Sequence, residues 1–399
     1  MLGSLLLTGA LAELGVRLLR PREHQLEPAP VDLESYFSAQ EVQRGTRFAR
    51  PQRILGISRS VLQLGALVAV ARRSPRLSVT WPANPYARGA IGAGALATGL
   101  RLLSLPLAAV SRRRAMAVGL ITQSWGGWAG DVIKAAAIES AMAGGAGAAM
   151  LAVIRRYPRD WWLPAATGSV LVGTLLGALA PVLLDPLFND FTPLPDGELR
   201  SDVLALARAA GVEVGEVYEV DASRRTTAAN AYVTGLGPTK RVVLFDTLIE
   251  RFTHDEVRVV VAHELAHVRH RDVLRGLAYA ALVAPAAALA VKQLSTSISP
   301  QLDGPEALPT LALAAVLVAA PTGLIGNRLS RALERRADAY SLALSKAPEA
   351  FISFERAIAL QNVIDLRPPR WVTALLATHP STLERIGAAV TYAERSGEA

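Results

Sequence analysis

Seven apolar stretches constrain this chain more than any other feature of its sequence. With a hydropathy window they cover about residues 2–20, 54–71, 89–110, 136–154, 162–184, 276–296 and 307–327. Each comes close to the roughly 20 helical residues that cross a bilayer. The last three are the clearest, whereas Glu13 and Arg17 interrupt the first stretch and Arg101 interrupts the third. The sequence therefore predicts a mainly α, polytopic membrane protein of about seven transmembrane helices.

The charges of the chain fit a membrane protein better than a nucleic-acid-binding protein. Only 19% of the residues are charged, against about a quarter in a soluble domain. The net charge is +8, and many of the positive charges form short arginine clusters beside apolar stretches, such as Arg112–Arg114. Clusters at that position are typical of membrane flanks. We therefore expect the lipid bilayer as a partner and no nucleic acid.

Two parts of the chain are expected in water, and they define the domain division. The first has a proline-rich entry followed by a helix at 197–210, strands at 217–220, 228–234 and 240–245, and a helix at 255–270. The turn Gly235–Pro238 would join the last two strands as a hairpin. The predicted division is N-terminal transmembrane helices 1–184, a domain with the hairpin 185–275, two further transmembrane helices 276–327, and a helical part 328–399.

The sharpest chemical signal is the pentapeptide His263-Glu264-Leu265-Ala266-His267. Two histidines at i and i+4 lie on one face of a helix and can bind one metal ion. Glu264 points about 100° away, beside the metal, where it can accept a proton from bound water. The chain has no cysteine, so a zinc site must use histidine and carboxylate ligands. The motif therefore predicts a zinc peptidase with Glu264 as its general base.

The third zinc ligand is not contained in this motif. Catalytic zinc usually has three protein ligands and one open position. His270 could compete as a ligand, although it stands in a basic run. A carboxylate is the better candidate, because Glu334 and Asp338 share a helical face and one could bind metal while the other orients a histidine. On that segment alone, a solvated helix with several arginines is the simpler interpretation.

The order of the motifs resembles the CAAX prenyl protease type I family of membrane zinc endopeptidases, with the bacterial HtpX proteases as more distant relatives. The matching segments are DPLFNDFTPLPDGEL at 185–199, NAYVTG at 230–235, KRVVLFDTL at 240–248, HELAH at 263–267, SRALERRAD at 330–338 and THPSTLERI at 378–386. They follow the family order over about 185–390, whereas 1–130 matches only loosely. The resemblance implies one zinc ion per chain, held by His263, His267 and Glu334. It also implies that Asp338 contacts one of these ligands and not the zinc ion itself.

The resemblance also implies that three further residues reach the cleft: Asn230, His379 and Arg385. His379 would be a hydrogen-bond donor to the oxyanion that amide hydrolysis builds. The strand that contains Asn230 could be an edge strand, to which an extended substrate adds through backbone hydrogen bonds. The substrate would be a peptide or a membrane-proximal protein, which could carry a lipid.

Two other function classes compete with an integral-membrane zinc metalloendopeptidase. A scaffold with structural zinc would not need Glu264 or an open coordination position. A transporter would find support in the intramembrane charges Arg101 and Glu139, but it leaves the metal motif unexplained. The peptidase is therefore favoured.

Arginine counts indicate an orientation in the membrane. With the N-terminus outside, the cytoplasmic side would hold 21–53, 111–135, 185–275 and the C-terminus, although the opposite loops also contain arginines. We expect an integral protein of the cell membrane whose catalytic part faces the cytoplasm.

Overall fold

The computed structural model describes residues 1–399 except 24–25, 74–81, 236–239, 301–302 and 398–399. Within the described part, seven helices are long and apolar enough to cross a membrane. They contain the seven predicted stretches to within one residue, so the predicted fold class is confirmed. These helices are α1 (Leu2–Leu19), α3 (Ala39–Arg73), α4 (Pro85–Ala117), α5 (Trp125–Arg156), α6 (Trp162–Leu183), α10 (Asp272–Ile298) and α11 (Leu308–Ser345).

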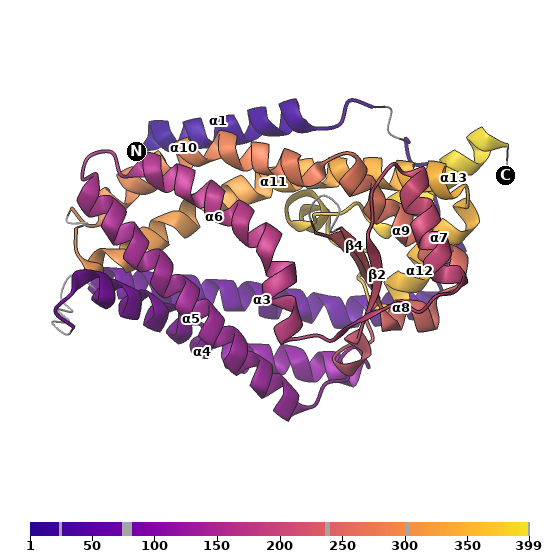
Figure 1. The fold of residues 1–399 in the computed structure, drawn as a ribbon, viewed down its shortest axis with the longest axis horizontal. Coiled ribbons are helices and arrows are strands. Elements are labelled where there is room, and N and C mark those ends of the chain that lie inside the picture. The colour runs from indigo at the N-terminus through magenta and orange to yellow at the C-terminus, as the bar shows by residue number, and fades with distance from the viewer. Residues whose placement is uncertain (24–25, 74–81, 236–239, 301–302, 398–399) are drawn as a thin grey trace.

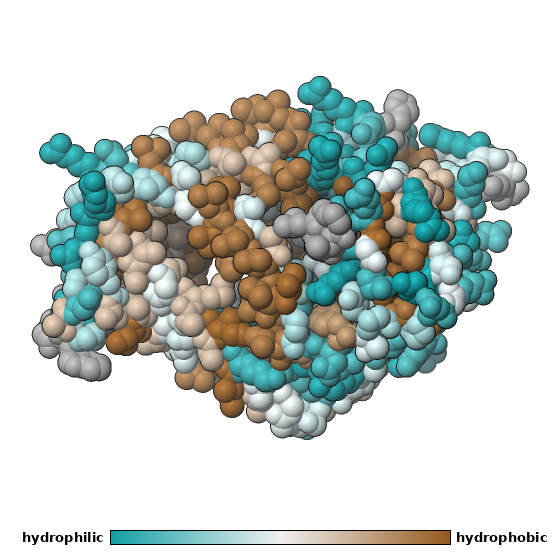
Figure 2. Space-filling view, viewed as in Figure 1, coloured by the Kyte–Doolittle hydropathy of each residue, from teal (hydrophilic) through white to brown (hydrophobic). Residues whose placement is uncertain are grey.

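The long helices form one end of an elongated molecule and the sheet with the shorter helices forms the other. Figure 1 shows α1, α3, α10 and α11 running lengthwise, with α4, α5 and α6 crossing obliquely. Apolar residues gather over the long helices, and polar residues gather over the end that carries the sheet (Figure 2). The molecule therefore has a lipid-facing part and a water-facing part, as the hydropathy pattern predicts.

Small residues allow α4 and α5 to approach each other closely. A Cβ atom on Gly144 would lie 2.9 Å from the carbonyl oxygen of Ala90, and one on Gly147 would lie 2.7 Å from the Cβ of Ala93. Such contacts hold helices together where no water drives their association. Between the same helices, Arg101 donates to Glu139 at 2.8 Å, so these two intramembrane charges neutralise each other.

The water-facing part contains a four-stranded sheet with the order β1-β2-β4-β3. Its strands are β1 (Phe191–Pro193), β2 (Glu216–Val220), β3 (Ala231–Thr234) and β4 (Arg241–Phe245). β2 and β4 are parallel, whereas β3 pairs antiparallel with β4, which confirms the predicted hairpin. Its turn lies outside the described residues except for Gly235, whose φ of 101° favours glycine. β3 is an edge strand, also as predicted.

Two details of the sheet differ from the sequence prediction. The first is that β3 begins at Ala231 and not at residue 228, because the preceding segment bonds elsewhere: Thr226 and Thr227 donate to carbonyls at Leu120 and Gly119. The second is β1, which the sequence analysis missed because the strand is short and ends in Pro193. A proline is tolerated there because β1 lies at the edge of the sheet.

Shorter helices complete the water-facing part of the molecule and carry part of the site. They are α2 (Leu33–Tyr36), α7 (Glu198–Ala209), α8 (Asp246–Arg251), α9 (His254–Arg269), α12 (Pro348–Gln361), the π-helical segment η6 (Val372–Leu376) and α13 (Thr382–Ser396). α7 and α9 pack on the sheet around fully buried residues such as Val203, Val242 and Leu265. Burial of each such side chain contributes about 1.5–3 kcal/mol. This core fixes α9, which carries the metal motif.

The helix α11 connects the two parts of the molecule without a break. It begins in the last apolar stretch and continues to Ser345, and therefore crosses the predicted domain boundary at 327/328. One continuous helix thus belongs to both sides of that boundary. The domain division stays a prediction.

Candidate metal centre

The helix α9 begins with a strong local signal. The Thr253 side chain accepts from the backbone N–H of Glu256, and the Glu256 carboxylate accepts from the backbone N–H of Thr253. This reciprocal capping box satisfies N–H groups that the first helical turn leaves free. The helix then presents His263 and His267 one turn apart towards α11, with their rings 4.9 Å apart.

Three ligand atoms converge between α9 and α11. The Nε2 atoms of His263 and His267 lie 3.2 Å apart. The carboxylate of Glu334 on α11 lies 3.2 Å from the Nε2 of His263 and 3.6 Å from the Nε2 of His267. Two ligands bound at about 2.05 Å to a tetrahedral zinc ion lie about 3.3 Å apart. The three donor atoms are therefore spaced as a tetrahedral metal ion requires.

The other ring nitrogens of both histidines face carboxylates. The Nδ1 of His263 lies 2.9 Å from Asp338, and the Nδ1 of His267 lies 2.9 Å from Asp272. A carboxylate can only accept in such a contact, so each Nδ1 carries a hydrogen, and in the neutral imidazole each Nε2 then presents a lone pair. In that neutral form, two lone pairs and the Glu334 carboxylate face one another and repel unless a proton or a metal cation lies between them. The residues therefore fit a divalent metal ion.

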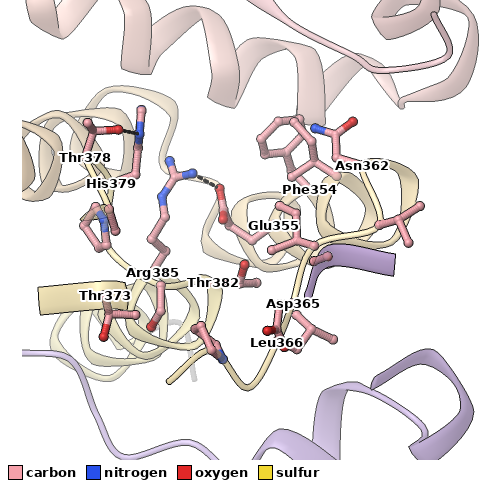
Figure 3. A pocket seen from close by; sticks show the side chains of 18 of the residues that line it. Phe354, Glu355, Asn362, Asp365, Leu366, Thr373, Thr378, His379, Thr382 and Arg385 are labelled. Carbon is pink, nitrogen blue, oxygen red and sulfur yellow. Dashed lines mark hydrogen bonds and ion pairs between the residues drawn. The ribbon is translucent and has the colours of Figure 1, made fainter. Parts of the chain in front are cut away.

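Asp338 is held by a buried ion cluster. Arg385 on α13 donates to Asp338 through Nη2 at 2.6 Å and through Nε at 3.0 Å. The same guanidinium contacts Glu355 of α12 at 2.5 Å (Figure 3). Burial alone would lower the pKa of Arg385, but Asp338 and Glu355 raise it. Burial also raises the pKa of Glu355 to about 7.

Asp272 and Glu355 are residues of the site that the sequence analysis missed. Asp272 begins α10, and the preceding Arg271 has a φ of 56°, so the chain turns sharply and returns the Asp272 carboxylate to His267. The buried Arg336 on α11 also donates to Asp272. The available signal was the position of Asp272, five residues after His267, although spacing alone does not reveal such a turn.

His270 lies away from the three ligand atoms. Its Nδ1 is 2.9 Å from the carbonyl oxygen of Ala266, and its ring packs edge-on against Tyr340. Among the described residues, the group with metal-ligand spacing is His263, His267 and Glu334. The geometry thus favours Glu334 over His270 as the third ligand.

A cavity of about 740 Å³ opens beside the ligands and contains the other predicted residues. Glu264, Asn230, His379 and Arg385 all line it. The Nε2 of His379 lies 3.4 Å from Glu334, and its Nδ1 lies 2.9 Å from the hydroxyl of Thr378; Figure 3 shows the latter pair. Burial raises the pKa of Glu264. All four side chains therefore lie around one cavity beside the candidate ligand atoms.

Comparison with known proteins agrees with this geometry. Residues 193–393 match the model of peptidase family M48. The chain belongs to peptidase family M48. Residues 22–190 match the N-terminal model of CAAX prenyl proteases, which describes five membrane helices. The predicted family is confirmed, and this M48 protein is a membrane metallopeptidase of the CAAX prenyl protease type.

Individual relatives support the assignment to M48. The uncharacterized metalloprotease YhfN of Bacillus subtilis is 32% identical over 294 residues, which are 71% of this chain and 69% of that protein. CAAX prenyl protease 1 of Saccharomyces cerevisiae is 34% identical over 156 residues, which are 39% of this chain and 34% of the yeast protein. The crystal structure of S. mikatae Ste24p matches with a TM-score of 0.79 at 21% identity, over 97% of this chain and 96% of that chain, and shows that the fold is shared.

Proposed function

We propose that this M48 protein is an integral-membrane zinc endopeptidase with one zinc ion held by His263, His267 and Glu334. The convergence of these three ligand atoms carries the proposal. Neutral imidazoles and a carboxylate are ligands that zinc accepts. Zinc, when bound there, would polarise a peptide carbonyl and activate water as the nucleophile.

The side chains around the ligands have separate tasks in this proposal. Glu264 accepts the proton of the attacking water and delivers it to the amine that leaves. A raised pKa suits this task, because a general base works best when its pKa lies near the operating pH. His379 donates to the oxyanion. Asp338 and Asp272 keep His263 and His267 in the tautomer that presents Nε2.

Arg385 and Asn230 have positioning roles in this proposal: Arg385 positions Asp338, and Asn230 lies beside the path of the substrate. Arg385 holds Asp338 through two hydrogen bonds, so its effect reaches the metal through His263. Asn230 immediately precedes the edge strand β3 and lines the cavity. An extended peptide that adds to β3 therefore passes Asn230 on its way to the metal.

The substrate would be an extended peptide close to the membrane. The cavity is lined by residues of the water-facing part and by Phe48 and Gln52 of the membrane helix α3. Several relatives are named CAAX prenyl proteases, so a prenylated peptide is the substrate class that we infer. We further propose the cell membrane as the location and the cytoplasm as the side of the catalytic part.

One experiment separates this function from a zinc scaffold and from a transporter. The purified protein is reconstituted in vesicles with a prenylated peptide, and zinc content and cleavage are measured for wild type and Glu264→Gln. We expect about one zinc per chain in both proteins and a loss of cleavage of about a hundredfold or more in the variant. The exposed Glu349 on α12 provides the control, and Glu349→Gln should cleave normally. A zinc-loaded wild type without peptidase activity would support the scaffold.

A further inference from the structure

A second cavity, of about 560 Å³, lies between the end of α1 and the middle of α11. We call it the arginine pocket, because its lining contains Arg20, Arg22, Arg328, Arg331 and Arg335, together with Val16, Pro21 and Ala332. No carboxylate is among the lining residues in the described part of the chain. The pocket therefore differs from the metal centre, where carboxylates balance the cationic groups.

Acidic neighbours neutralise only part of this charge. Glu13 accepts from Arg328 and also from Arg17. Glu384 accepts from Arg335 at 2.6 Å. Arg331 donates to the backbone carbonyl oxygens of Ala374 and Ala377 and not to a carboxylate.

The remaining two arginines of the pocket have no such partner. Within the described residues, Arg20 and Arg22 have no carboxylate within 4.0 Å, and Glu23 beside them lies 3.8 Å from Arg336. In the described part of the chain, three arginines of the pocket, counting Arg331, thus lack a counter-ion within 4.0 Å. An anion would supply one.

The position of the pocket indicates where the anion comes from. Arg20 and Arg22 directly follow α1, which is apolar enough to cross a membrane. Arg328 follows the apolar part of α11. Arginines at the ends of membrane helices lie at the level of lipid head groups, and clusters of them attract anionic lipids. A soluble anion would not require a site built from two membrane helices.

We propose that the arginine pocket binds the phosphate of an anionic phospholipid head group. The site is also linked to the metal centre. Arg335 is adjacent to the ligand Glu334 in α11, and Arg331 bonds the Ala377 carbonyl, two residues before His379. A bound head group would thus stabilise the end of α1 against the helix that carries the metal ligand.

The test measures binding of lipid to the delipidated protein in a neutral detergent. Phosphatidylglycerol is titrated, and the rise in the thermal midpoint gives an apparent affinity. Arg20→Gln/Arg22→Gln removes two charges without leaving a carboxylate unpaired. Because each basic residue near anionic lipid contributes about 1 kcal/mol, we expect affinity to fall about thirtyfold. Phosphatidylcholine should cause no comparable rise in the wild type.

The matched control is Arg72→Gln/Arg73→Gln, which removes two exposed arginines at the other end of the membrane helices. Arg73 lies about 30 Å along α3 from Arg53, which contacts Asp365 of the water-facing part. This control should bind phosphatidylglycerol as the wild type does. Equal losses in the two double variants would overturn the proposal, as would equal responses to both lipids.

Two further arms complete the design. Inorganic phosphate at millimolar concentration should not displace the lipid, and displacement would assign the pocket to a free phosphate ion instead. Arg22→Glu is the second variant, for use if the double variant does not fold, and it should weaken binding by tenfold or more. Unchanged binding in a folded Arg22→Glu protein would exclude the pocket as the lipid site. All readouts are independent of peptidase activity.

Discussion

Asp272 and His267 lie 2.9 Å apart across the tight turn between α9 and α10. The contact parallels the one between Asp338 and His263 on the opposite side of the ligands. Each histidine of the proposed metal site thus has its own carboxylate, one delivered by a local turn and the other by a distant helix. Such carboxylates fix the ring orientation and raise the basicity of the ligand nitrogen.

We expect Asp272→Asn to weaken zinc binding by roughly tenfold to a hundredfold. The amide oxygen can still accept from Arg336, so the protein should fold, but the neutral group no longer strengthens His267 as a ligand. Competition with a chelator of known affinity measures the change. Asp196→Asn, at a side chain that is 97% exposed, serves as the control. A zinc affinity equal to wild type would remove Asp272 from the site.

Glu334→Ala should lose zinc, whereas His270→Ala should retain it. The Glu334 carboxylate lies within 3.6 Å of both histidine nitrogens, while His270 bonds the backbone of its own helix. Metal analysis of the two purified proteins decides between the two candidate ligands. Retention of zinc by Glu334→Ala together with its loss from His270→Ala would reverse the assignment.

His379→Ala should reduce turnover by about a hundredfold, because removal of one oxyanion donor has an effect of that order. Zinc content and the thermal midpoint should stay near wild type, since His379 is 61% exposed and contacts the ligand set only at 3.4 Å from Glu334. Steady-state kinetics, metal analysis and thermal unfolding are measured on one preparation. A zinc-free His379→Ala protein would show instead that His379 is a ligand.

Glu355 should make stability depend on pH. Its pKa is raised from 4.5 to about 7 in the folded protein, so the folded state holds this proton more tightly than the unfolded state. The stabilisation is complete below about pH 4.5 and is lost as the pH rises through about 7, with an upper limit of about 3 kcal/mol.

The variant Glu355→Gln cannot ionise and isolates this effect. The thermal midpoint of the wild type should fall relative to that of Glu355→Gln between pH 5 and pH 8. Glu349→Gln, at an exposed position of the same helix, should keep a constant difference from wild type over that range. A constant difference for Glu355→Gln as well would mean that Glu355 stays charged beside Arg385.

The membrane helices and the two histidines could be predicted from sequence because both depend on local patterns. Hydropathy over about 20 residues determines whether a helix can cross a bilayer. The spacing of His263 and His267 determines that they share a helical face. Glu334 could not be predicted as a ligand from its own segment, because that segment alone favoured a solvated helix. Only the resemblance to a family assigned it as a ligand.

Asp272 and Glu355 could not be predicted because their roles depend on tertiary structure. The Asp272 carboxylate reaches His267 only because Arg271 adopts a left-handed conformation, which a non-glycine residue rarely does. Glu355 reaches Arg385 because α12 packs beside α13, and no sequence spacing relates two such helices. The strand β1 was missed for a third reason. Its three residues, which end in a proline, are too few to show an alternation of apolar and polar side chains.

The continuous helix α11 determines how far the candidate metal centre lies from the bilayer. The helix runs from the apolar stretch through Glu334 to Ser345, and Glu334 lies seven residues beyond the predicted apolar end at 327, or about 10 Å at the rise of an α-helix. With zinc bound at Glu334 as proposed, this continuous helix would fix the distance between the bilayer and the scissile bond. For a peptide anchored in the same membrane, the distance of a bond from its anchor would select the cleavage site, and a folded protein without an extended tether could not reach it.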